Sequence, residues 1–459
     1  MSRPRKDRPN RVKELKTTRR TVVRERAVLV EVTLGGDAVG LEGHRDRLQE
    51  LGRLADAAGA QVVASATQRR RGVDPSTYVG RGKAEELGRL AAAERAHVVI
   101  FDNDLSPAQV RNLEAAAQTK VIDRSELILD IFASRARTHE ARLQVELAQL
   151  EYLYPRLRRL WTHLSRLEGG GIGTRGPGET QLETDRRLVR RRITDLKRKI
   201  RDIDARKERV VQSRGDRLAV GIVGYTNAGK SSLLNALTHA HAYVEDKLFA
   251  TLDTRTRAWD LPHHLTALLS DTVGFVRDLP HHLVASFKAT LEEAVHADLL
   301  LHVADVSTGH LEADVAAVHA VLDQIGCADK PQLIVLNKCD LVTDPLRLDL
   351  AARLFPGAVL ASATRGDGLP DLAGAVARRL VGPPRAVTVR ASPDDGRFLA
   401  WLQRHAEVLE RSLEDGRLVH RVRLPERLVL EIPRRAGRPV GVTSDDPDFV
   451  LPPSEADAP

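Results

Sequence analysis

One segment of the chain combines glycines, a lysine and a hydroxyl in the spacing that holds phosphate groups. Residues 224–231 have the sequence GYTNAGKS, follow the apolar run 219–223 and open a helical pattern at Ser232. Glycines let backbone N–H groups close around phosphate oxygens, and a helix N-terminus favours negative charge. Lys230 would reach the β- and γ-phosphates of a nucleotide, and the Ser231 hydroxyl would bind Mg²⁺. The segment therefore predicts a phosphate-binding loop.

Two further segments could hold magnesium and sense a γ-phosphate. The DTVG segment begins at Asp271, whose carboxylate can hold the magnesium shell through water, and ends at Gly274, whose N–H can contact the γ-phosphate. Thr251 lies between this segment and the phosphate loop, in the sequence FATLD, and can close on Mg²⁺ when a γ-phosphate is present. We name residues 249–253 the first switch and residues 271–280 the second switch.

A fourth segment could recognise guanine. Residues 337–340 (NKCD) end with Asp340, whose carboxylate can accept two hydrogen bonds from guanine N1–H and N2–H₂, a donor pair that adenine lacks. Asn337 can bridge the base and the phosphate loop, while the stem of Lys338 covers the ring. Residues 362–364 (SAT) follow the next strand and could offer a backbone N–H to guanine O6. This ordered set predicts a GTPase domain of the Ras-like class.

These motifs define the predicted site. The residues expected to bind GTP are Gly224, Tyr225, Thr226, Asn227, Ala228, Gly229, Lys230, Ser231, Phe249, Ala250, Thr251, Leu252, Asp253, Asp271, Thr272, Val273, Gly274, Asn337, Lys338, Cys339, Asp340, Ser362, Ala363 and Thr364. Those expected to act in hydrolysis are Lys230, Thr251, Asp271 and Gly274, and those expected to bind Mg²⁺ are Ser231 and Thr251.

Phe275 follows Gly274 at a position where Ras-like enzymes carry a glutamine that orients the attacking water. A phenyl ring cannot orient water. We therefore expect slow intrinsic hydrolysis that a partner accelerates by ordering the site. A compatible structural explanation is that Phe275 packs beneath a mobile switch.

The motifs require a sheet to position them. Most of the runs that precede them are nearly continuous and apolar, which is typical of a parallel sheet covered on both faces. The predicted strands of this GTPase domain, residues 218–382, are 218–223, 265–269, 299–306, 332–336 and 358–361.

The segment before this domain, residues 139–217, has a different pattern. Apolar residues alternate spacings of four and three, which predicts a heptad seam on two helices. The seam residues are Leu143, Leu147, Leu150, Tyr154, Leu157, Trp161 and Leu164, then Val189, Ile193, Leu196, Ile200, Ile203 and Val210. Residues 169–178 contain too many glycines for a helix. We expect an antiparallel helical hairpin with a glycine-rich, cationic tip, and a kink at Pro155.

Two smaller domains complete the expected multidomain α/β chain. Strand-like runs at 27–32, 61–64 and 97–101, a helix around 84–96 and a helix start at 104–107 predict an N-terminal α/β domain over residues 27–138. A linker at Pro383 precedes a small α+β domain over residues 383–443, in which 417–424 and 427–432 are expected to form a strand pair. Residues 1–26 are expected to be a disordered basic tail and residues 444–459 a frayed acidic tail.

Composition limits the class of protein. The chain has 459 residues, of which 42% are hydrophobic, and no apolar run is long enough for a membrane span. Its two cysteines cannot form a disulfide framework, which favours the cytoplasm. The net charge of +8 is concentrated: residues 1–26 hold 11 Lys and Arg against 3 acidic residues, and residues 155–217 hold 19 against 9. Such clusters favour a polyanionic partner, although a solubilising tail and a solvated helix face would have the same composition.

The whole pattern resembles HflX-type GTPases. The segment 169–187 (GGGIGTRGPGETQLETDRR), placed directly before a GTPase domain, is similar to the signature of that family. Other similar segments are 78–83 (YVGRGK), 101–107 (FDNDLSP), 123–126 (DRSE) and 271–280 (DTVGFVRDLP). The sequence departs from the family at Thr254 and Arg255, where Pro-Thr is expected.

The resemblance implies a monomeric translational GTPase that binds GTP and GDP with Mg²⁺, associates with the large (50S) ribosomal subunit and its rRNA, and splits or rescues stalled ribosomes under stress. It implies stimulation of hydrolysis by ribosomes and no stable membrane insertion. The basic hairpin agrees, because a glycine-rich loop can approach RNA closely and arginines can pair with phosphates. The expected RNA-binding residues are Arg175, Arg186, Arg187, Arg190, Arg191 and Arg192.

Two other functions fit parts of the sequence. The protein could be an assembly GTPase of the large subunit, which binds precursor particles. It could also be a non-catalytic RNA-binding protein with a structural nucleotide, but Ser231, Thr251 and Asp271 are all intact, which favours hydrolysis.

Overall fold

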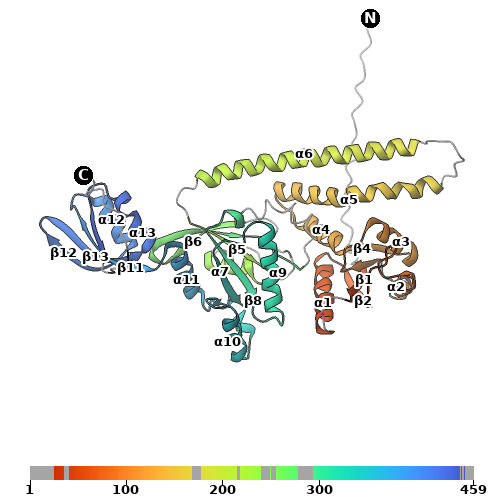
Figure 1. Cartoon of the computed structure of the whole chain (residues 1–459), viewed down its shortest axis with the longest axis horizontal. Helices are drawn as coiled ribbons and strands as arrows, with labels where there is room; N and C mark the ends of the chain where they lie inside the picture. Colours follow the sequence, from red (N-terminus) through yellow and green to blue (C-terminus); the bar gives the residue numbers. More distant parts are fainter. Residues whose placement is uncertain are drawn as a thin grey trace, which may run out of the picture. The chain divides into compact units, whose positions relative to one another are not determined.

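The computed structural model describes residues 25–35, 41–167, 177–213, 218–238, 249, 255–277, 293–444, 446 and 449 (Figure 1). The predicted basic tail before Glu25, the tip of the hairpin, most of the first switch and nearly all of the acidic tail lie outside these residues. The chain divides into two compact units, residues 1–123 and 124–459. Each unit is described by itself.

The first unit contains a parallel sheet with the strand order β2-β1-β3-β4. Its elements are β1 (Arg26–Leu34), α1 (Leu41–Ala57), β2 (Gln61–Arg70), α2 (Arg81–Ala93), β3 (Val98–Phe101), α3 (Pro107–Ala117) and β4 (Lys120–Asp123). The predicted α/β alternation is confirmed, and α3 begins where expected: Ser106 caps it by accepting a hydrogen bond from the Gln109 N–H, and Pro107 follows. The short strand β4 was not predicted.

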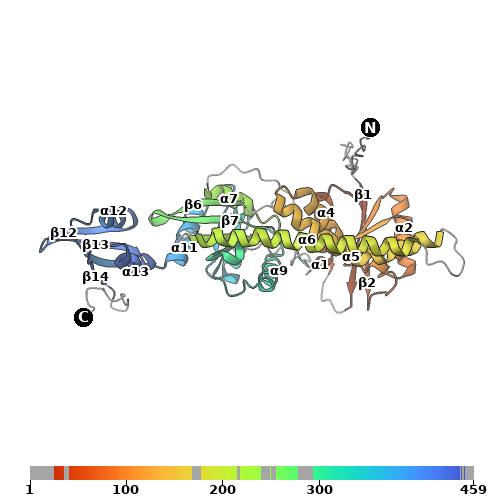
Figure 2. The same cartoon turned by 90° about the horizontal axis from the view of Figure 1, so that it is seen from above.

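The second unit begins with α4 (Arg124–Arg135) and a helical hairpin of α5 (His139–Leu167) and α6 (Pro177–Ser213). The two long helices lie side by side in both views (Figures 1 and 2). Leu143, Leu147 and Leu196 are buried between them, with partly buried Leu150, Ile193, Ile200 and Ile203 around them, so this part of the predicted seam is confirmed. Helix α5 continues through Pro155. Helix α6 begins earlier than predicted, because proline suits the first helical position.

The GTPase domain follows, with a sheet in the order β10-β9-β8-β5-β7-β6. Its strands are β5 (Leu218–Gly224), β6 (Arg255–Leu261), β7 (Leu265–Asp271), β8 (Leu299–Asp305), β9 (Gln332–Asn337) and β10 (Val359–Leu360). Its helices are α7 (Lys230–Thr238), α9 (Leu311–Gln324), α10 (Pro345–Leu354) and α11 (Leu369–Val381), with short 3₁₀ turns η1 (Pro262–His264) and η2 (Cys339–Leu341). The five predicted strands are confirmed. The additional strand β6 runs antiparallel to β7 at the edge of the sheet.

The C-terminal part has an antiparallel sheet in the order β12-β13-β11-β14. Its elements are β11 (Pro384–Ala391), α12 (Gly396–His405), β12 (Glu407–Glu414), β13 (Arg417–Pro425), α13 (Glu426–Arg435) and β14 (Gly441–Ser444). This is the ferredoxin-like arrangement of two split βαβ units. The predicted strand over 427–432 is wrong: that segment is helical, and its buried Leu428, Val429 and Ile432 recur at the spacing of one helix face.

One apolar core joins the GTPase sheet to the C-terminal sheet. Buried Val376 on α11, Val389 on β11 and Ile432 on α13 belong to the same cluster as Leu269 on β7. Packing of these apolar side chains against one another holds the two domains together on the side of β6 and β7. None of the described helices is long and apolar enough to cross a membrane.

Candidate nucleotide-binding site

The phosphate-binding loop lies where β5 ends and α7 begins, as predicted. Two of its glycines are required by close packing. A Cβ atom on Gly224 would lie 2.2 Å from the carbonyl oxygen of Val303, and a Cβ on Gly229 would lie 2.3 Å from Asn337 Nδ2. Gly229 also has a φ of +91°, which L-residues rarely adopt. The loop therefore keeps its backbone closely packed against neighbouring strands.

Lys230 lies inside this loop. Only 7% of the residue is exposed, and its Nζ donates hydrogen bonds to the carbonyl oxygens of Gly224 at 3.0 Å and Tyr225 at 2.7 Å. Burial lowers the pKa of Lys230 from 10.5 to about 8. Gly274 approaches from the second switch, because a Cβ atom there would lie 2.9 Å from Lys230 Nζ. The sequence-predicted lysine and DTVG glycine thus meet in space.

Ser231 and Asp271 form an oxygen-rich pair beside the loop. The Ser231 hydroxyl donates a hydrogen bond to Asp271 Oδ2 at 2.6 Å, and Asp271 is fully buried at the end of β7. Hydroxyl and carboxylate oxygens are the hard ligands that Mg²⁺ prefers. Within the described residues, no cluster of three His, Cys, Asp or Glu side chains could hold a metal without other ligands. The fit to magnesium rests on the Ser231 hydroxyl and the Asp271 carboxylate, which lie side by side. Thr251 lies outside the described residues.

The second switch is tied to the phosphate loop through its backbone. The Phe275 N–H donates to the Gly224 carbonyl at 3.1 Å, and the Thr226 N–H donates to the Phe275 carbonyl at 2.7 Å. The Phe275 ring is 2% exposed and packs in a cluster with Val223 and Leu300. The predicted packing role of this ring is confirmed.

The NKCD segment lies next to the phosphate loop. Asn337 Nδ2 donates to the Ala228 carbonyl at 2.9 Å, and its Oδ1 accepts the Ala363 N–H at 3.1 Å. The Asn337 side chain thereby fixes the phosphate loop and the 362–364 loop in one position. Lys338 has a left-handed φ of +64°, and its Nζ lies 2.7 Å from Asp305 Oδ2.

Asp340 has one oxygen without a partner. Its Oδ2 accepts a long hydrogen bond of 3.5 Å from Thr364 Oγ1, while Oδ1 is buried and has no hydrogen-bond partner in the described part of the chain. A buried carboxylate oxygen that lacks a donor is costly unless a ligand supplies one.

The three residues of the 362–364 loop differ in what their N–H groups bind. The Ser362 N–H donates to the Asp367 carbonyl at 2.9 Å, and the Ala363 N–H is the donor to Asn337 Oδ1. These two N–H groups are therefore used in contacts within the protein. Cys339 has an intermediate burial and donates its N–H to the Ala361 carbonyl at 3.2 Å.

The first switch is described only at Phe249. Its ring is 2% exposed and lies edge-to-face on Phe132, with ring centroids 4.6 Å apart. The side chain is therefore used in packing, and only the backbone of this residue could contact a nucleotide. Ala250, Leu252 and Asp253 lie outside the described residues, together with Thr251.

Two contacts at the site were not predicted. Asp305, at the carboxyl end of β8, pairs with Lys338. Its position near the end of the predicted strand 299–306 was a signal, because the carboxyl ends of parallel strands meet at one edge. The hydroxyl of Tyr225 accepts the Arg277 N–H at 2.9 Å, a second connection between the phosphate loop and the second switch. No sequence pattern indicated that contact.

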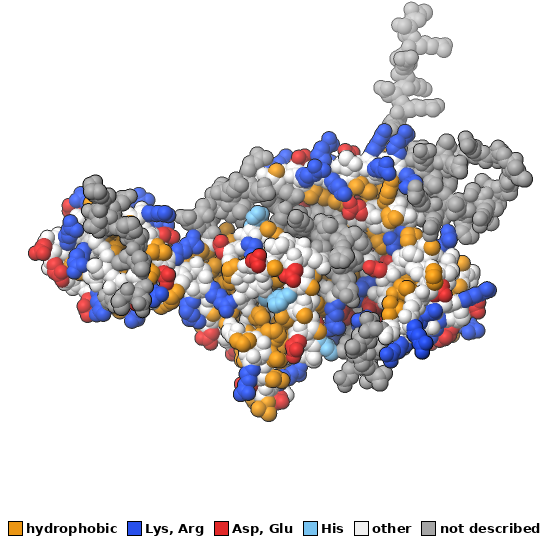
Figure 3. All heavy atoms as spheres, viewed as in Figure 1, with side chains coloured by type: hydrophobic (Ala, Val, Ile, Leu, Met, Phe, Trp, Pro, Cys, Tyr) orange, Lys and Arg blue, Asp and Glu red, His pale blue; other side chains and the backbone are white. Residues whose placement is uncertain are grey.

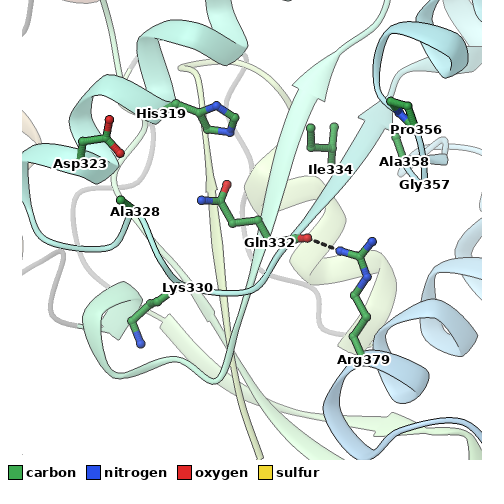
Figure 4. A pocket seen from close by; sticks show the side chains of 10 residues that line it. All are labelled: His319, Asp323, Ala328, Lys330, Gln332, Ile334, Pro356, Gly357, Ala358 and Arg379. Carbon is green, nitrogen blue, oxygen red and sulfur yellow. Dashed lines mark hydrogen bonds between the residues drawn. The ribbon is translucent and has the colours of Figure 1, made fainter.

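A separate pocket of about 450 Å³ lies at the opposite, amino end of β9 (Figure 4). His319, Gln332 and Arg379 contribute to its walls, and Arg379 donates a hydrogen bond to the Gln332 carbonyl. None of the predicted nucleotide-binding residues lines it. The pocket is therefore distinct from the candidate site.

Comparison with known proteins identifies the family. Three family models match in order: "GTP-binding GTPase N-terminal" at residues 45–133, "GTP-binding GTPase Middle Region" at 135–214 and "50S ribosome-binding GTPase" at 219–338. Among solved structures, SsGBP in complex with GDP is similar over 78% of this chain and 98% of its own, at 26% identity and a TM-score of 0.45.

Curated relatives cover nearly the whole chain. The GTPase HflX of Escherichia coli is 46% identical over 87% of this chain and 94% of its own length. The GTPase HflX of Caldanaerobacter subterraneus is 43% identical over 85% of this chain and 89% of its own. With a phosphate loop, a second switch and a base-side NKCD segment assembled around one site, the chain belongs to the HflX family of GTPases.

Proposed function

We propose that this GTPase binds the large ribosomal subunit through RNA, that the subunit stimulates its GTP hydrolysis, and that the cycle splits or rescues stalled ribosomes. The observation that carries the proposal is a row of exposed cations on α6, the long helix that leads into the GTPase domain. The family-model description of residues 219–338 supports the same partner.

The nucleotide site suits GTP hydrolysis with Mg²⁺. Ser231 and Asp271 would hold the ion, together with Thr251 of the first switch. When bound, magnesium supplies neutralisation of charge on the β- and γ-phosphate oxygens. Lys230 would exchange its hydrogen bonds to loop carbonyls for phosphate oxygens, and the Gly274 N–H would contact the γ-phosphate. These residues position and stabilise charge, which is the main requirement of phosphoryl transfer.

The proposed preference for guanine rests on Asp340. Its buried Oδ1 has no donor within the described residues, and guanine N1–H and N2–H₂ would supply one to each carboxylate oxygen. Adenine would leave both oxygens without these donors. Asn337 would keep the base side and the phosphate side at a fixed separation, because it bonds to both loops.

The six arginines predicted to bind RNA fall into different environments. Arg192 forms a bidentate ion pair with Glu146 of α5, at 2.7 and 2.8 Å, and hydrogen bonding to that carboxylate raises the pKa of Arg192. Arg186 and Arg190 lie over the ring of Tyr154, at 5.4 and 5.8 Å from its centroid. These three side chains contact α5 and so stabilise the hairpin, although Arg190 and Arg192 are themselves exposed.

The other described arginines face solvent. Arg187 and Arg191 are exposed and one helical turn apart, so they project from the same side of α6. Further exposed cations along the helix are Arg198, Lys199, Arg201 and Arg206. Lys and Arg side chains gather along this helix in the space-filling view (Figure 3). We propose Arg187 and Arg191 as the phosphate contacts; Arg175 lies outside the described residues but remains part of the proposed RNA-binding tip.

Co-sedimentation with purified large subunits tests the proposal. The wild-type protein loaded with a non-hydrolysable GTP analogue should sediment with the subunits at low salt, and GDP-loaded protein should sediment less. An Arg187→Ala and Arg191→Ala double variant should sediment weakly with its GTP affinity unchanged. Equal sedimentation of the double variant and the wild type would contradict the proposed RNA contact.

A deletion strain separates splitting from subunit assembly. Ribosome splitting predicts that intact stalled ribosomes accumulate after heat or antibiotic treatment. Assembly predicts that precursors of the large subunit accumulate instead, which would contradict the splitting proposal.

A further inference from the structure

We propose that α4 is a positioning element for GTP hydrolysis, in which Arg124 holds the second switch and Phe132 holds the first. Both residues lie on a helix of twelve residues that belongs to none of the nucleotide-binding motifs. The inference deepens the proposed function, on which its last step rests, by assigning a route between the nucleotide and the hairpin.

Arg124 is the first residue of α4 and contacts the second switch directly. Its Nη2 donates a hydrogen bond to the carbonyl oxygen of Arg277 at 3.0 Å. The residue is only 4% exposed, although arginine is rarely buried without partners. Burying a guanidinium group is costly, so its position is fixed by the groups that it binds. Arg124 thus holds the backbone of the second switch three residues beyond Gly274.

Arg277 connects this contact to the phosphate loop. Its N–H donates to the hydroxyl of Tyr225 at 2.9 Å, and its side chain pairs with Asp314 of α9 at 3.3 Å. Arg277 is therefore held from three sides: by α4, by the phosphate loop and by α9. Loss of the contact from α4 would leave the carbonyl of Arg277 without this donor.

Phe132 contacts the first switch from the other end of the same helix. Its ring is 1% exposed and packs edge-to-face on the ring of Phe249, with centroids 4.6 Å apart. An edge-to-face aromatic pair is stabilising beyond the area that it buries. Phe249 also has a left-handed φ of +54°, which a bulky residue adopts only when its surroundings stabilise it. Phe132 is a neighbour that can do so.

The two contacts together give α4 a specific effect. In GTPases generally, the two switches change arrangement when the γ-phosphate is lost, and an element that binds one arrangement better shifts the equilibrium toward it. Because α4 is one rigid helix, its two ends move together. In the arrangement that makes these contacts, Gly274 lies beside Lys230, where its N–H could contact a γ-phosphate. We therefore assign Arg124 and Phe132 as positioning residues that favour this arrangement.

The same helix also contacts the hairpin. The Tyr152 hydroxyl of α5 donates to Glu126 Oε2 of α4 at 3.3 Å, and Tyr152 is 4% exposed. A change in the switches that moves α4 would reach α5 through this contact. If the hairpin binds the large subunit through α6, α4 is the element through which that binding affects the position of the switches.

The experiment uses full-length Arg124→Gln, Arg124→Lys, Phe132→Leu and Tyr152→Phe variants without ribosomes. Thermal unfolding establishes that each is folded. The ratio of GTP to GDP affinity is measured with fluorescent nucleotides, and kcat is measured for basal GTP turnover. A residue that only stabilises the fold lowers the unfolding temperature but leaves the affinity ratio unchanged.

Arg124→Gln should lower kcat and the GTP-to-GDP affinity ratio, each by roughly tenfold, because small displacements of catalytic groups have effects of that order or larger. Arg124→Lys keeps a donor and should recover part of both losses. Phe132→Leu keeps the apolar volume, removes the ring and should change the ratio in the same direction by a smaller factor. Tyr152→Phe lies outside the catalytic machinery and should leave both basal quantities unchanged.

Unchanged ratios and kcat values in folded Arg124→Gln and Phe132→Leu would overturn the assignment. If Arg124→Gln does not fold, Arg124→Lys and Phe132→Leu decide it by the same criteria. In a second assay, Tyr152→Phe should weaken stimulation by large subunits. Absence of stimulation in the wild type would contradict the proposed function, while the ribosome-free results would still decide the positioning roles; normal stimulation of Tyr152→Phe would overturn the connection to the hairpin alone.

Discussion

The nucleotide site and the helical hairpin use polar and charged side chains in opposite ways. Lys230, Asp271 and Asn337 are at most 7% exposed, and each has short hydrogen bonds to its neighbours. Arg187 and Arg191 on α6 are exposed. A site that must recognise one nucleotide requires fixed geometry, whereas a surface that meets the phosphate backbone of an RNA needs positive charge at about the right place. The comparison predicts that substitutions in the first region act on specificity and rate, and that those in the second act on salt-dependent affinity.

The largest effect is expected from Asp340→Asn. Loss of the carboxylate removes two charge-assisted hydrogen bonds to guanine, which should weaken GTP binding by about 1,000-fold. An asparagine amide can donate to the 2-oxo group of xanthine, so binding of xanthosine triphosphate should improve. Competition against a fluorescent nucleotide measures both. Retention of wild-type GTP affinity would show that Asp340 does not bind the base.

The next effect concerns Gly274→Ala. The new Cβ would lie 2.8 Å from Thr226 Cγ2 and 2.9 Å from Lys230 Nζ, so the second switch must shift away from the γ-phosphate. Single-turnover GTP hydrolysis should fall by about 100-fold. Gly309→Ala is the matched control, since a Cβ there meets nothing within 4 Å. Equal rates in the two variants would contradict the proposed contact of Gly274.

Burial of an ionisable side chain in the GTPase domain also predicts that the stability of this domain falls in acid. The exposed side chains of the hairpin should not have this effect. The pKa of His302 on β8 is lowered from 6.5 to about 3. Burial is the main cause, and the charges of the nearby His319 and Lys230 contribute. The unfolded chain therefore binds more protons between these values, and stability falls as pH is lowered from 6.5 toward 3. The loss at pH 5 should be about 2 kcal/mol. Denaturant unfolding at pH 7 and pH 5 measures this loss of stability. It should be smaller in His302→Phe, whereas a variant of the exposed His296, His296→Gln, should lose as much stability as the wild type. Equal losses in the wild type and both variants would contradict the role given to His302.

The smallest expected effect separates the two kinds of arginine on the hairpin. Replacing Arg187 and Arg191 with alanine should weaken binding to large subunits by about tenfold and reduce the salt slope by about 2, one for each lost phosphate contact. Arg192→Ala should instead lower the thermal stability of the hairpin, since Arg192 pairs with Glu146, and change the salt slope little. Binding titrations over a range of salt concentrations measure the slopes. The distinction fails if Arg192→Ala flattens the slope as much as the double variant does.

Much of the nucleotide site could be predicted because its motifs are local and follow strands. Parallel strands bring their carboxyl ends to one edge, so the segments after β5, β7, β9 and β10 had to meet. The tertiary contacts could not be predicted in the same way. Nothing in the spacing shows that Phe132 lies on Phe249 or that Arg124 reaches the Arg277 carbonyl, because these residues are far apart in the chain.

Local ambiguity explains the errors elsewhere. The run 427–432 is short and rich in branched apolar residues, which fits a strand as well as a helix; the burial of Leu428 and Ile432 against the sheet decides for the helix. On α6 the cluster of arginines in the sequence predicted a positive charge, but not which arginines face α5 and which face solvent. Arg192 lies four residues before Leu196, on the side of the seam, whereas Arg187 and Arg191 lie on the solvent side.

The proposed activation by the large ribosomal subunit is tested by GTP turnover at fixed magnesium, with and without purified subunits and with ATP as the control nucleotide. We expect slow turnover of GTP by the protein alone, large stimulation by the subunits and no comparable stimulation with ATP. Tight GTP binding without any stimulation would contradict the claim that the large subunit is the activating partner.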